Sequence, residues 1–152
     1  MKLILFFGFL FLMNSAFSQQ LSITQNFAFG TFAPSIGTSI VTIDPYGTRT
    51  ISGGAIPIGY FNYFPAIFTY TAKKGKKNII VHIIYNTNVN IYSNGHSMVV
   101  KIGPTNHHND TFITTSNQTT EIRIGGRLTI NNATLNPSGN YSGSFTVTII
   151  QE

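Results

Sequence analysis

The sequence contains no cysteine and, among its 152 residues, only four acidic ones. Without cysteine no disulfide can form, so an exported form of this chain depends on its hydrophobic core alone. Catalysis by paired carboxylates needs two acids brought together, but Asp44 lies in a turn motif and Glu152 ends the chain. The sequence also has no Gly-x-Ser-x-Gly motif around a serine nucleophile. We therefore expect no enzymatic activity and no cofactor.

Metal-ligating residues are equally sparse. His107 and His108 are followed by Asp110, but neighbouring residues on one loop lack the spaced third ligand that a metal site needs. His82 lies within a strand-like run, where we expect a hydrogen-bonded histidine. The sequence therefore predicts no metal site.

The N-terminus has the order of a secretory signal peptide. Lys2 precedes the apolar run 3–13, and the small-residue segment 14–18 follows. This run is shorter than the roughly 20 residues that a membrane-spanning helix needs. We expect cleavage after Ser18, which leaves residues 19–152 as one domain. That domain is exported to the periplasm, cell surface or extracellular space, without a lipid anchor, a transmembrane anchor or a C-terminal sorting extension.

Short runs of Ile, Val, Thr, Phe and Tyr recur between Gly, Pro and Asn residues, and no helical period persists for three turns. Many short strands separated by turns are typical of an antiparallel β-sandwich or barrel. The predicted strands are 21–32, 39–43, 48–52, 67–72, 78–85, 89–92, 98–103, 121–131 and 141–151. The polar stretch 106–120 predicts a long surface loop or a weak edge strand.

Alternation assigns faces to two of these strands. In the last strand, the predicted apolar face contains Tyr141, Phe145, Val147 and Ile149, and the polar face contains Ser142, Ser144, Thr146 and Thr148. In 121–131, the predicted buried face contains Ile122, Ile124, Leu128 and Ile130. The run 78–85 is apolar on both faces except at His82, which predicts a central strand covered on both sides or one lying under a loop.

Positive charge is concentrated in one place. The formal net charge is +5, and four of the nine basic residues are Lys73, Lys74, Lys76 and Lys77. They are predicted to form a hairpin tip that meets phosphate or acidic sugar, or a solvated turn that protects a sheet edge. The aromatic stretch 60–65 either presents rings to a sugar or caps the core. The rest of the surface is neutral and rich in Ser, Thr and Asn, which argues against a nucleic-acid partner.

Three blocks of sequence suggest a family. They are Phe27–Phe32; Asp44–Thr50 with Gly53-Gly54 and Ala66–Thr69; and Ile124–Thr129 with Gly139–Thr148. Together they resemble an uncharacterised family of secreted bacterial proteins, domain of unknown function 4402. The resemblance implies a single Ig-like or pilin-like sandwich, similar to fimbrial and spore-coat-like subunits, with no enzymatic activity.

The resemblance also bears on function. Chaperone–usher fimbrial subunits begin with an alternating segment that completes a neighbour's sheet, and here Leu21, Ile23 and Phe27 are the residues that such a segment offers. The alternative is that 21–32 forms the first strand of its own sandwich. We expect an exported structural or adhesive surface subunit, fimbria-like and assembling through its N-terminal strand with itself or with other envelope subunits. The rival expectation is a soluble binding module that recognises glycan or anionic envelope ligands through its loops.

Overall fold

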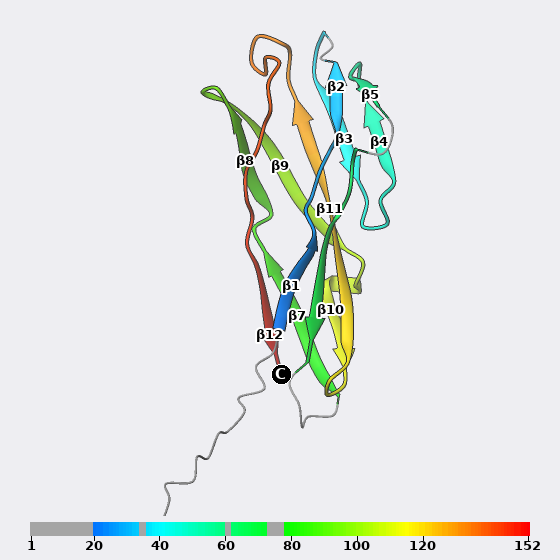
Figure 1. The fold of residues 1–152 in the computed structure, drawn as a ribbon. Coiled ribbons are helices and arrows are strands. Elements are labelled where there is room, and N and C mark those ends of the chain that lie inside the picture. Colours follow the sequence, from blue (N-terminus) through cyan, green and yellow to red (C-terminus); the bar gives the residue numbers. More distant parts are fainter. Residues whose placement is uncertain (1–19, 34–35, 60–61, 73–77) are drawn as a thin grey trace, which may run out of the picture.

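The computed structural model describes residues 20–33, 36–59, 62–72 and 78–152, and within them the fold is all-β (Figure 1). The described residues contain no helix with the length and apolar content that a bilayer crossing requires. The strands are β1 Gln20–Gln25, β2 Thr31–Ala33, β3 Ser39–Ile43, β4 Arg49–Ser52, β5 Ile56–Ile58, β6 Ala66–Thr71, β7 Ile79–Tyr85, β8 Asn88–Ser93, β9 His96–Thr105, β10 Thr111–Thr114, β11 Thr119–Ile130 and β12 Val147–Gln151, with a 3₁₀ turn at His108–Asp110.

The long strand β11 organises the larger sheet. Its Ile124 pairs with Ala66 of β6 and with Thr105 of β9, so these two strands flank opposite edges. Further along, Gly126 pairs with Ile43 of β3 and again with β9, which places β3 beyond β6 on the same edge. Strands β1, β4 and β8 extend the sheet outside β6, β3 and β9, and every pairing is antiparallel.

A second, smaller sheet has the order β10-β7-β12 and packs on the larger one. Tyr70 of β6 is fully buried, and its ring meets Phe112 of β10 edge-on at a centroid distance of 5.9 Å. Gln151 of β12 donates a hydrogen bond to the Tyr70 hydroxyl. Contacts of this kind join the sheets around one core, so the predicted antiparallel sandwich is confirmed. At the other end of the molecule β2 pairs with β5.

The alternation of the two best-defined strands is also confirmed. Ile122, Ile124, Leu128 and Ile130 of β11 are buried. The apolar residues of the last segment pack against the core, while Ser142, Ser144, Thr146 and Thr148 are exposed. Regular pairing of this segment with β7 begins only at Val147. Earlier in the segment, Ser142 forms a single bridge to Tyr92 of β8.

Strand β7 differs from its prediction. It is central in its sheet, between β10 and β12, but only one of its faces is covered. Val81 is fully buried on the inner face, whereas Ile84 on the outer face is 49% exposed. The apolar run therefore does not indicate cover on both sides.

Other boundaries also change. The predicted strand 21–32 is two strands, β1 and β2, separated by a segment that makes one bridge, from Ala28 to Phe64. Strand β5 was not predicted, and β10 is the weak edge strand within 106–120. The four lysines, Lys73, Lys74, Lys76 and Lys77, lie outside the described residues. Strands β6 and β7 belong to different sheets and do not pair with each other. The prediction that they form a hairpin is therefore wrong.

Candidate binding groove

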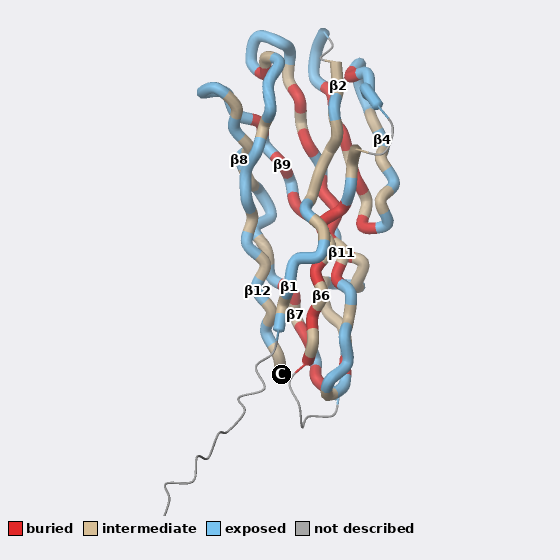
Figure 2. The backbone as a smooth tube through the Cα atoms, in the orientation of Figure 1, coloured by how far each residue is buried: buried red, intermediate tan, exposed pale blue. Residues whose placement is uncertain are grey.

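A groove of about 980 Å³ opens between two extended segments that cover one part of the larger sheet. One segment is 26–30, which links β1 to β2, and the other is 136–145, which leads into β12. Figure 2 shows both segments as largely exposed or intermediate, with buried stretches of β9 and β11 behind them. The floor includes Val100 of β9 and Leu128 of β11.

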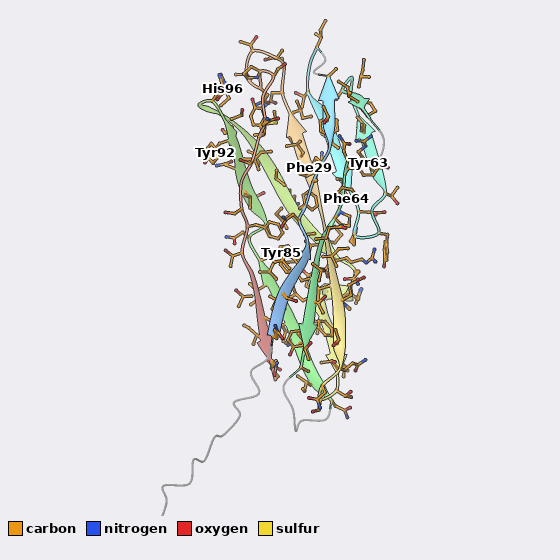
Figure 3. All side chains as sticks on the ribbon, viewed as in Figure 1. Phe29, Tyr63, Phe64, Tyr85, Tyr92 and His96 are labelled. Carbon is orange, nitrogen blue, oxygen red and sulfur yellow. The ribbon has the colours of Figure 1, made fainter. Side chains whose placement is uncertain are left out.

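The first wall presents two aromatic rings to the core. Phe27 and Phe29 stand two residues apart, and their rings contact edge-on at a centroid distance of 4.6 Å. Both pack against the core as partly buried residues. Between them, Ala28 donates to the Phe64 carbonyl at 2.9 Å and accepts from the Phe64 N–H at 2.8 Å. Figure 3 labels Phe29 and Phe64 on these neighbouring segments.

The second wall has the same construction. Ser142 exchanges both backbone hydrogen bonds with Tyr92 of β8, at 2.8 and 3.1 Å. Tyr141 and Phe145 pack against the core, and Phe145 meets Phe68 of β6 edge-on at 6.3 Å. The Tyr141 hydroxyl donates to the Pro137 carbonyl and fixes the bend before this wall.

In the described part of the chain, the backbone groups of four wall residues have no hydrogen-bond partners. In an antiparallel pair, a residue that exchanges both bonds turns its neighbours' N–H and C=O groups to the other side. The groups of Phe27 and Phe29 therefore point away from Phe64, and those of Tyr141 and Gly143 point away from β8. Within the described residues, none of these four makes a backbone hydrogen bond. The groove thus lies between two strand-like edges with unpaired polar groups.

Two glycines allow the walls to approach the larger sheet. A Cβ built on Gly126 of β11 would lie 3.0 Å from Cζ of Phe27, so the missing side chain makes room for that ring. A Cβ on Gly143 would lie 2.7 Å from the carbonyl oxygen of Asn90 in β8. Larger residues at either position would force a wall to move.

The groove carries no charge. Among the described residues that line it, none is Asp, Glu, Lys, Arg or His. Its polar groups are backbone amides and the side chains of Ser, Thr, Asn, Gln and Tyr. An occupant with a charged group in the groove would therefore lose hydration without gaining an ionic partner.

The structure places the predicted donor residues in the protein's own fold. Leu21 and Ile23 belong to β1, where they pair with Tyr70 and Phe68 of β6. Ile23 is 64% exposed and lies at the border of the groove, and Phe27 forms the first wall. Donating β1 to another molecule would first require its release from β6.

The aromatic stretch 60–65 is described only from Asn62 onward. The Tyr63 ring stacks on the Arg49 guanidinium, with Cζ 4.0 Å from the ring centroid, as Arg favours on aromatic faces. Tyr63 is thus engaged within the fold, while Phe64 is partly exposed. Tyr92 and His96 lie at the β8–β9 end, away from Tyr63 (Figure 3).

The histidines make structural contacts. The His107 ring stacks on Phe112 at 4.5 Å, and its Nε2 lies 3.1 Å from the Glu121 carbonyl oxygen. His82 Nδ1 lies 3.1 Å from the Thr111 hydroxyl. In the described part of the chain, no group of three His, Cys, Asp or Glu residues is placed to hold a metal.

Asp110 anchors a polar cluster beside β7. It accepts hydrogen bonds from the Tyr85 hydroxyl at 3.0 Å and from the Thr105 hydroxyl at 2.8 Å. Burial, together with the hydrogen bond and the negative charge of Asp110, raises the pKa of Tyr85 to about 12. Sequence reasoning did not find this cluster, because its members are brought together only by the fold.

Sequence reasoning did not give the position or the lining of the groove, although the alternating rings of Phe27 and Phe29 were a usable signal. The family model described as Domain of unknown function (DUF4402) matches residues 21–150. The resemblance to that family is therefore confirmed. Among curated proteins and solved structures, nothing matches this chain.

Proposed function

The chain belongs to the DUF4402 family, and we propose that it is an exported, non-enzymatic structural or adhesive subunit at the cell surface. The observation that carries this proposal is the uncharged groove between two unpaired edges. A subunit of an assembly needs a surface whose apolar and backbone groups are completed by a partner. The groove provides such a surface, and its described lining residues include no Asp, Glu, Lys, Arg or His.

The positions of the acidic residues support a non-enzymatic role. Asp44 accepts the N–H groups of Tyr46 and Thr48 and so shapes its turn. Asp110 is held by Tyr85 and Thr105, and Glu121 pairs with Arg123 at 2.5 Å. Each of these carboxylates has a structural partner, and none lines the groove.

Fimbria-like assembly at the surface is the form of this function that we favour. The signal-peptide pattern of residues 2–18 supports export, and the absence of cysteine makes the folded domain independent of disulfide formation. The contact that we assign to assembly is the groove, since β1 already completes the sheet beside β6.

Electron microscopy and size-exclusion chromatography of the exported protein test this function. We expect fibres or dilution-resistant oligomers, and we expect Ile23→Lys to abolish them by placing a charge at the groove border. Ile113→Lys is the matched control, because Ile113 is 69% exposed on the outer face of the smaller sheet. A wild-type protein that remains monomeric at high concentration, alone and with its envelope partners, would contradict the proposal.

A further inference from the structure

We propose that the groove binds an extended, uncharged polypeptide segment from a partner subunit, which inserts as an added β-strand between the two walls. The inference rests on the proposed function for the source of that segment. It goes further in assigning the chemistry of the partner and the atoms that bind it. A lipid or sugar would fill an apolar groove equally well, so the argument depends on the backbone.

The two walls offer strand-pairing groups from opposite sides. On one wall the free N–H and C=O groups belong to Phe27 and Phe29, and on the other to Tyr141 and Gly143. Buried or partly buried backbone groups require partners, and an extended peptide supplies a donor and an acceptor to each side in alternation. A single inserted strand would therefore form backbone hydrogen bonds with both walls at once.

The directions of the walls define the arrangement. Figure 1 shows the chain from β1 toward β2 running opposite to the chain that enters β12. An inserted strand is therefore parallel to one wall and antiparallel to the other. Alternate side chains would point toward Val100 and Leu128 on the floor, and the side chains between them would face solvent.

The composition of the groove limits the segment. Because no described lining residue is charged, we expect the inward side chains of the partner to be apolar and its backbone to make the polar contacts. Both described ends of this chain are already paired, since Gln20 opposes Thr71 and the Glu152 N–H bonds to the Ile80 carbonyl. A partner therefore has to provide a segment that is free of its own sheets.

Peptide binding to the exported chain tests the inference. The probe is a synthetic peptide with the sequence of residues 144–151, SFTVTIIQ, which is uncharged and largely alternating. Two further peptides carry N-methyl groups on one or the other alternate set of residues, which removes the N–H donors toward one wall without changing any side chain. We expect the unmodified peptide to bind, and each methylated peptide to bind at least tenfold more weakly.

Two variants locate the site. Ile23→Lys should weaken binding of the unmodified peptide, whereas Ile113→Lys should leave it unchanged. Equal binding of all three peptides would show an apolar cavity without strand pairing and overturn the inference, as would binding of none. Fibres that form while no peptide binds would leave the proposed function standing, and peptide binding by a protein that never assembles would reject only that function.

Discussion

Replacing Phe145 by alanine tests how the last segment holds the two layers together. Full burial would give a loss of about 3–5 kcal/mol for this change. Phe145 is only partly buried, because it lines the groove, but its ring also meets Phe68 edge-on at 6.3 Å. A pair of this kind contributes about 0.5–1.5 kcal/mol beyond burial. We therefore expect Phe145→Ala to lower the free energy of unfolding by about 2–3 kcal/mol.

The neighbouring residue supplies the control. Thr146 is exposed on the opposite face, and its backbone N–H, which bonds to Asn86 Oδ1, is retained in alanine. Thr146→Ala should change stability by less than about 0.5 kcal/mol. Urea unfolding followed by circular dichroism measures both variants, with an unchanged dependence on urea concentration as the sign of a pure stability effect. Equal losses at the two positions would refute the face assignment, since a shift of one residue exchanges the faces.

The remaining predictions concern the predicted leader, a partly buried tyrosine and the first strand. Mass spectrometry of the exported protein should find a chain that begins at Gln19, and a chain retaining residues 1–18 would contradict the signal peptide. Between pH 10 and 12 an unfolded tyrosine loses its proton while Tyr85 keeps it, so stability should fall as pH rises through that window, and less steeply in Tyr85→Phe. At neutral pH the free energy of unfolding of the same variant should be lower by about 1 kcal/mol, because the hydrogen bond to Asp110 is lost. An alkaline unfolding profile that is the same in the variant and the wild type would reject this role of Tyr85. Deleting residues 19–25 should unfold or strongly destabilise the domain, because β1 covers the edge of β6, and a stable folded product in circular dichroism would contradict that role.

The alternation of apolar and polar residues correctly predicted strands that have one covered face and one exposed face. Strand β3 was predicted with its observed bounds, and the inner face of β11 was correct, because one side of each alternates as a half-covered sheet requires. The same rule failed for β7. Isoleucines such as Ile80 and Ile84 on its outer face are exposed, and a sequence pattern does not report whether another layer covers them.

The groove depends on contacts that no local pattern contains. Its walls lie more than a hundred residues apart in the chain, and each is fixed by one bridge, from Ala28 to Phe64 and from Ser142 to Tyr92. A single bridge between distant residues produces no alternating pattern from which it could be predicted. The close approach at Gly126 is visible only when Phe27 is placed above it.

Amide hydrogen exchange of the wall residues, compared between the free protein and its assembled form, tests the central claim most directly. The Ala28 N–H is bonded to Phe64 and should exchange slowly in both forms, which makes it an internal control. The N–H groups of Phe27 and Phe29 should exchange rapidly in the free protein and become protected when a partner strand enters the groove. Protection of both in the free protein, or continued rapid exchange in the assembly, would contradict the account.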